Sequence, residues 1–116
     1  MSDIGGSSLE DFIQAASTRL QLPRAIYLRI AKMAVLEGQK DMAELEQAVA
    51  GEDLKQIQAI SHRLKGAAAN LGLDMVALPA TEMNNLSKGP ENMARIKELS
   101  AQIKQAFEVD LKGLSG

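Results

Sequence analysis

Apolar residues recur every three or four positions along most of the chain, the spacing that places them on one face of an α-helix. Breaks rich in Gly, Pro or Asp divide this pattern, and no alternating strand pattern is present. We predict a short helix over residues 9–20 and longer helices over residues 23–50, 53–71, 74–87 and 91–111. Short connections between amphipathic helices favour antiparallel neighbours, so the predicted fold class is all-α. The expected architecture is an antiparallel up-down four-helix bundle with a short additional N-terminal helix.

The ends of the chain and two interior positions complete this plan. Residues 1–6 are expected to be a flexible lead-in, residues 7–112 the helical bundle, and residues 113–116 a tail. Gly38 either bends one long helix or separates two, and the pattern does not decide between them. Pro79 predicts a kink in its helix or a late start of that helix.

The core is predicted to be aliphatic, because the chain has only two Phe, one Tyr and no Trp. On the second helix the large apolar side chains predict the buried face: Ile26, Ile30, Met33, Leu36, Met42, Leu45 and Val49. On the helix over residues 53–71, a turn of about 100° per residue gathers one broad stripe: Leu54, Ile57, Ile60, Ser61, Leu64, Ala67, Ala68 and Leu71.

Composition and charge narrow the classes of function. The chain has no cysteine, which excludes disulfides, thiol catalysis and cysteine-ligated metal. Its net charge is −2 with both signs interspersed, so nothing indicates a surface for nucleic acid. No apolar run approaches the length of a membrane span, and the first residues lack the pattern of a signal peptide. We therefore expect a soluble cytoplasmic monomer that binds neither nucleic acid nor membrane.

The only histidine, His62, falls nearly opposite the centre of the apolar stripe on its helix, so it is predicted to be exposed. Lys65 and Gly66 lie one turn further along the same face, and Gln58 and Ala69 flank it. An ammonium at Lys65 can pair with a phosphoryl group on the ring. Gly66 costs about 1 kcal/mol against Ala in a helix interior, a cost that access to the imidazole would offset.

The surroundings of His62 contain no catalyst of their own. No Asp or Glu lies within a turn on the same face, so no triad-like arrangement is evident. One histidine without a second soft ligand disfavours a metal site, and no Gly-rich phosphate loop is present. This pattern indicates a nucleophile in a transfer reaction whose catalyst belongs to another protein. A surface histidine of no consequence is the competing interpretation.

The segment His62-Arg63-Leu64-Lys65-Gly66, with a second glycine ten residues after the histidine, resembles the signature of one family. That family is the histidine-containing phosphotransfer (HPt) domain of multistep two-component phosphorelays. The resemblance implies a four-helix bundle in which His62 is the phosphoacceptor, Lys65 the phosphate-side cation and Gly66 the clearance residue. It implies a phosphocarrier, not an enzyme, that accepts a phosphoryl group from a receiver-domain aspartate and passes it to another receiver.

The resemblance also suggests partners. They are response-regulator receiver domains and a hybrid sensor histidine kinase, and the receiver contributes the divalent metal, so this chain is expected to need no cofactor. Asn84 and Lys88 match positions that can be polar and near the site in relatives. Together with Gln58 and Ala69, they are candidate partner-docking residues.

Three other classes of protein remain to be weighed. The phosphoacceptor helix pair of a sensor kinase usually follows its histidine with an acidic residue and an Arg-Thr-Pro type continuation, which Arg63-Leu64-Lys65-Gly66 does not match. A helical adaptor would bind partners through its outer face, with His62 incidental. A metalloenzyme is disfavoured because the pattern contains no inward cluster of ligands.

Overall fold

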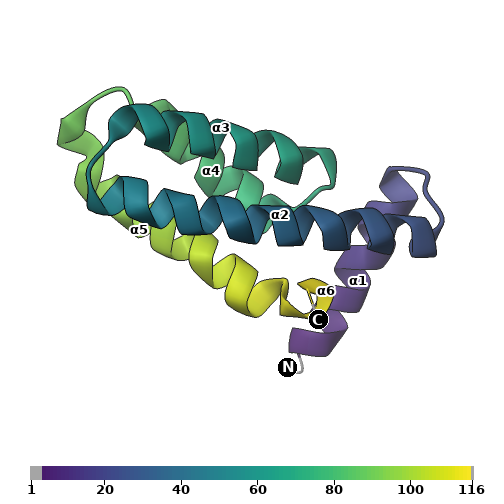
Figure 1. Cartoon of the computed structure of the whole chain (residues 1–116). Coiled ribbons are helices and arrows are strands. Elements are labelled where there is room, and N and C mark those ends of the chain that lie inside the picture. Colours follow the sequence, from purple (N-terminus) through teal and green to yellow (C-terminus); the bar gives the residue numbers. More distant parts are fainter. Residues whose placement is uncertain (1–3, 116) are drawn as a thin grey trace.

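The computed structural model describes residues 4–115, with side chains for residues 9–114, and over that range it contains helices and no strand. Its body consists of four helices: α2 (Arg24–Ala50), α3 (Leu54–Asn70), α4 (Asp74–Leu86) and α5 (Met93–Gln105). Successive helices run in opposite directions (Figure 1), so the predicted all-α bundle is confirmed.

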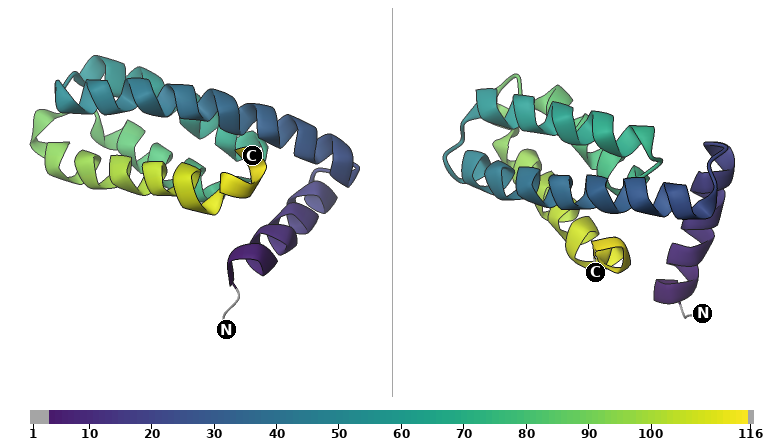
Figure 2. Two further views of the ribbon diagram at one scale, coloured as in Figure 1. Left: turned by 60° about the horizontal axis from the view of Figure 1, so that its bottom comes forward. Right: turned by 45° about the vertical axis from the view of Figure 1, so that its right-hand side comes forward.

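Shorter elements flank this body. α1 (Ile4–Arg19) precedes it at a steep angle to the bundle axis and leads into the start of α2 (Figure 2). Pro90–Asn92 form a 3₁₀ turn, η1, before α5. After α5 the chain continues through a π-helical turn, η2 (Ala106–Asp110), and a last short helix, α6 (Lys112–Ser115). The π-helical turn divides the predicted helix over residues 91–111.

Helical structure extends further toward both ends of the chain than the sequence pattern predicts. α1 begins at Ile4, five residues before the predicted helix start at residue 9, and residues 1–3 of the predicted lead-in lie outside the described residues. The predicted tail contains α6, in which Leu114 is only 4% exposed. A Cβ at Gly113 would lie 2.6 Å from a methyl carbon of Leu9, so α1 and α6 pack directly against each other.

The buried face of the N-terminal half of α2 differs from the predicted one. Four predicted core side chains are exposed: Ile26, Ile30, Met33 and Leu36. The face that is buried instead carries Tyr27, Ala31, Val35, Gly38, Met42, Leu45 and Val49. These positions are spaced by three or four residues without interruption, whereas the predicted set jumps six residues between Leu36 and Met42. A straight helix can bury only one continuous stripe, and the continuous one contains the small residues Ala31, Val35 and Gly38.

The bounds of α2 and α4 decide between the alternatives predicted for Gly38 and Pro79. α2 is one continuous helix through Gly38, where the ring of Phe107 packs against the backbone: an added Cβ would lie 2.5 Å from its Cζ. α4 begins at Asp74, five residues before Pro79, so a late start at the proline is wrong. Ala67, predicted to be buried, is exposed at the edge of the α3 stripe beside an open cavity of about 200 Å³ between α2 and α3.

Candidate functional site

The helix that carries the histidine is defined at both ends by side-chain and backbone caps. The Asp53 carboxylate accepts from the backbone N–H of Gln56 at 3.2 Å, which satisfies a free donor at the start of α3. At the other end Gly72 has φ +72°, and the N–H of Leu73 donates to the Ala68 carbonyl at 2.9 Å. This six-to-one bond is a Schellman motif, in which glycine is favoured because φ is positive. The predicted end of this helix near residue 71 is confirmed.

The end of α3 is also tied to the start of α2. The hydroxyl of Tyr27, which is completely buried, donates to the Leu71 carbonyl at 2.8 Å. Burial raises the pKa of the Tyr27 phenol, and the positive charge of Arg19 partly opposes this rise. The hydrogen bond holds the start of α2 against the turn that follows α3.

His62 lies on the exposed face of α3, as its position opposite the apolar stripe predicts. The stripe itself is buried at Ile57, Ile60, Leu64 and Ala68. Gln58, Gly66 and Ala69 are exposed like the histidine, and Lys65 is half-buried. The structure therefore brings four of the predicted site residues to one side of α3 with His62.

The surroundings of Gly66 show that packing does not require a glycine there. A Cβ built at Gly66 meets no atom within 4 Å, in contrast to Gly38, whose Cβ would collide with Phe107. Side chains on a helix lean toward its N-terminus, so a side chain at residue 66 would lean over the turn that contains His62. The missing side chain leaves the space beside the imidazole open.

The cations beside His62 differ in their partners. Nη2 of Arg63 lies 2.9 Å from Oδ1 of Asp41 and 3.2 Å from Oε1 of Glu44, both on α2. The hydrogen bond to Asp41 is the largest cause of the raised pKa of Arg63. Lys65 makes no ion pair with any residue of the described part of the chain, so its ammonium is available to an incoming anion.

The two candidate docking residues on the α4 side lie in different places. Nδ2 of Asn84 donates to the carbonyl oxygen of Gln58 at 2.9 Å and to Oγ of Ser61 at 3.2 Å. Lys88 is exposed in the turn after α4. Because α3 and α4 are antiparallel, Lys88 lies further toward the start of α3 than Asn84 does.

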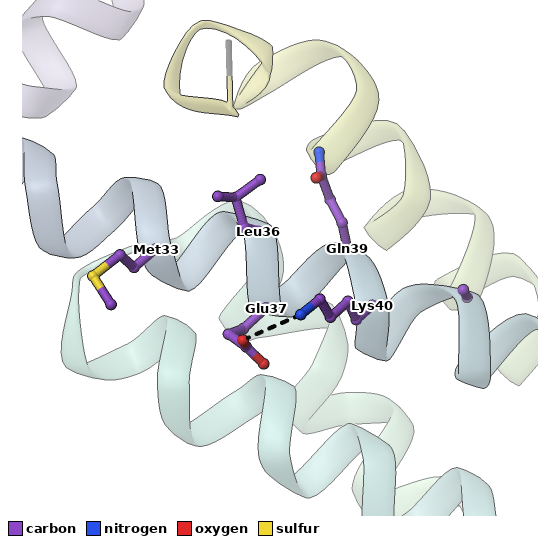
Figure 3. Close-up of a pocket in the computed structure, with 6 residues that line it drawn as sticks. Met33, Leu36, Glu37, Gln39 and Lys40 are labelled. Atoms are coloured by element: carbon purple, nitrogen blue, oxygen red, sulfur yellow. Dashed lines mark ion pairs between the residues drawn. The ribbon is translucent and has the colours of Figure 1, made fainter.

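The exposed apolar residues of α2 form a surface that the sequence pattern missed. Ile26, Ile30, Met33 and Leu36 are 38%, 41%, 64% and 45% exposed, and we call them the α2 apolar stripe. Figure 3 shows Met33 and Leu36 beside the exposed ion pair between Glu37 and Lys40, whose atoms are 3.7 Å apart. Contiguous exposed apolar side chains of this kind commonly mark interaction surfaces. The spacing of these four residues by three or four positions already places them on one face of the helix.

Within residues 4–115, no helix is long and apolar enough to cross a membrane. The same residues contain no group of three or more His, Cys, Asp or Glu side chains placed to hold a metal ion.

A four-helix bundle that presents a single histidine on an exposed helix face defines a class of protein in which the histidine, not a pocket, is the candidate reactive group. The family model of the Hpt domain matches residues 29–109 of this chain, and the chain belongs to that family. Searches of curated proteins and of solved structures found no match. The matched range contains α3, α4, α5 and most of α2, and excludes α1 and α6. Hpt domains are phosphotransfer carriers that interact with response-regulator receiver domains.

Proposed function

We propose that this chain is a phosphocarrier in a two-component phosphorelay, with His62 as the group that accepts and donates the phosphoryl group. The observation that carries the proposal is the open space at Gly66 beside an exposed His62. A helix interior favours Ala over Gly by about 1 kcal/mol, so a glycine that packing does not need indicates a different requirement. Access by a partner active site meets that requirement.

The proposed step is a direct phosphoryl exchange between two proteins. A ring nitrogen of His62 uses its lone pair to attack the phosphorus of a receiver aspartyl phosphate, while the ring proton stays on the other nitrogen. The P–N bond forms as the P–O bond breaks, and the aspartate leaves as a free carboxylate. The reverse reaction on a second receiver passes the group on.

The two sides contribute different groups to this step. On this chain, the unpaired ammonium of Lys65 would pair with the phosphoryl oxygens. The receiver would supply the divalent cation that neutralises the developing charge. This chain would then need neither a metal nor a nucleotide of its own, and it would act without autonomous kinase or phosphatase activity.

We propose that receiver domains dock over the exposed face of α3 and the neighbouring α2 apolar stripe. The link from Arg63 to Asp41 and Glu44 places α2 directly beside the turn that carries His62. Apolar contacts on α2 would supply affinity, because burying apolar surface contributes about 25 cal/mol per Å². The polar residues around His62 would then be free to serve the chemistry. Gln58 and Ala69 are the proposed docking residues on α3.

The direct test is transfer from a phosphorylated receiver domain to the purified chain. We expect label on this chain that is acid-labile and alkali-stable, as for a phosphohistidine, and no label on His62→Gln. A panel of receivers, including that of a hybrid sensor kinase, would identify the cognate partners. Label that persists in His62→Gln would sink the proposal.

A helical adaptor is the second candidate, because the α2 apolar stripe could bind a partner without any transfer. The two functions separate in one binding experiment. An adaptor would bind its partner without accepting label at any position of the chain. A phosphocarrier would accept label from the same receiver that it binds.

A further inference from the structure

One side chain of α4, Asn84, ties that helix to the turn of α3 that precedes His62. Its Nδ2 donates to the Gln58 carbonyl at 2.9 Å and to Oγ of Ser61 at 3.2 Å. Oγ of Ser61 in turn donates to the same Gln58 carbonyl at 3.2 Å. Ser61 is completely buried and Asn84 half-buried, so the two bonds that involve Ser61 are partly buried, while the bond from Asn84 to the Gln58 carbonyl is exposed.

The chemistry of the network fixes the orientation of the amide. A carbonyl oxygen can only accept, so the group of Asn84 that faces Gln58 must be the NH₂ and not the amide oxygen. The same NH₂ faces both α3 acceptors. A carboxylate of the same shape has no proton to donate and would direct a negative charge at the Gln58 carbonyl. Asp is therefore an isosteric replacement that breaks the network.

The acceptor of this bond belongs to the turn beneath the histidine. In an α-helix the carbonyl of residue 58 accepts from the backbone N–H of residue 62. Helical side chains lean toward the N-terminus, so the imidazole of His62 covers the turn that begins at Gln58. Asn84 thus ties the turn of α3 from Gln58 to His62 to the neighbouring helix α4.

The link on the other flank of His62 is of a different kind. Arg63 joins α3 to α2 through ion pairs whose side chains are 48%, 23% and 61% exposed for Arg63, Asp41 and Glu44. Exposed ion pairs contribute little to stability and weaken in salt. The network of Asn84 is uncharged and more buried, so it is the firmer of the two constraints.

We propose that Asn84 is a positioning residue for phosphoryl transfer, which acts by holding the turn from Gln58 to His62 in the orientation that the receiver active site needs. This role rests on the proposed function of His62 as phosphoacceptor. It differs from a docking role, because the NH₂ of Asn84 is engaged by acceptors on α3 of the same chain.

The test compares Asn84→Asp and Asn84→Ala with Asn85→Asp, in which the exposed neighbouring residue receives the same charge. Transfer from a phosphorylated receiver is followed over a range of receiver concentrations, which separates the maximal rate from the apparent KM. Amide hydrogen exchange at His62 and thermal unfolding are measured on the same samples. We expect the maximal rate of both Asn84 variants to fall on the order of tenfold, with an unchanged apparent KM. Exchange at the His62 amide should be faster, while Asn85→Asp resembles the wild type.

Three results would overturn the inference. An unchanged maximal rate in folded Asn84→Ala would show that the network does not position the histidine. A raised apparent KM with an unchanged maximal rate would make Asn84 a docking residue instead. A rate loss explained entirely by the unfolded fraction would make its role structural alone. If the wild type itself transfers nothing, the function proposed for His62 fails, and the exchange experiment still decides whether Asn84 holds this turn.

Discussion

Replacement of Gly66 by Ala should stabilise the protein, while replacement by Gln should slow transfer. A Cβ at this position meets nothing within 4 Å, so Ala adds no strain. It gains about 0.5–1 kcal/mol in helix propensity, which corresponds to a rise of about 2–4 °C in the melting temperature. Gln keeps part of that gain, but its side chain leans over His62 and obstructs the receiver. We expect a loss of transfer rate on the order of tenfold.

Two matched controls sharpen this prediction. Ala101→Gln places the same side chain on the exposed face of α5 and should leave transfer unchanged. Gly38→Ala makes the same chemical change in another helix interior with the opposite expected sign. Its Cβ would lie 2.5 Å from Cζ of Phe107, a ring only 4% exposed, and such overpacking costs about 1–3 kcal/mol.

The assays are thermal unfolding by circular dichroism and transfer from a labelled receiver under identical conditions. If Gly66→Ala destabilised the protein, the space around residue 66 would not be open to a side chain. If Gly66→Gln transferred as fast as the wild type, the missing side chain at residue 66 would not be what gives a receiver access to His62.

Three further predictions concern the bundle and its docking surface. Tyr27→Phe should lower the free energy of unfolding by about 1–3 kcal/mol, because it leaves the buried Leu71 carbonyl without its donor; an unchanged urea midpoint would contradict this. Tyr27 is the only tyrosine, so phenolate absorbance reports it alone, and its raised pKa places the midpoint above that of a free phenol. The folded state favours the neutral phenol, so stability should fall as pH rises through the folded pKa. Met33→Lys should weaken receiver binding without lowering the melting temperature, while Ala101→Lys should not; equal binding by both variants would exclude Met33 from the interface.

The fold and the exposure of the histidine could be predicted from sequence because α3 carries one unambiguous stripe. Ile57, Ile60, Leu64 and Ala68 recur at helical spacing, and no second set competes with them. His62 is opposite that stripe, so its exposure follows from helix geometry alone. Its role as phosphoacceptor remains a prediction that the transfer experiment tests.

The buried face of α2 could not be predicted from side-chain size, because its first half carries two apolar sets one residue apart. Ile30 and Leu36 are larger than their buried neighbours Ala31 and Val35, so a size criterion selects the wrong face there. The buried face is the one that continues at helical spacing into the buried residues Met42 and Leu45. Only the set that contains Ala31 and Val35 does so. Small residues on the buried side also let α2 approach its neighbours closely.

The partners of Asn84 could not be predicted for another reason. Periodicity assigns a residue to a face of its own helix, but it does not fix how far one helix slides along the next. The bonds to Gln58 and Ser61 depend on that register between α3 and α4, which the whole core determines. The sequence alone therefore indicates a polar residue near the site without identifying its bonds.

The contact between Leu9 and Gly113 joins the two ends of the chain, whereas the hairpins α2–α3, α3–α4 and α4–α5 join sequence neighbours. The entropic cost of closing a loop grows with its length, and the loop between Leu9 and Gly113 is long. The local hairpins can therefore form before α1 and α6 meet. The pairing of α1 with α6 should therefore be among the last events of folding and the first to come apart. Because α3 lies between its two hairpin partners, the face around His62 should stay assembled when the ends separate.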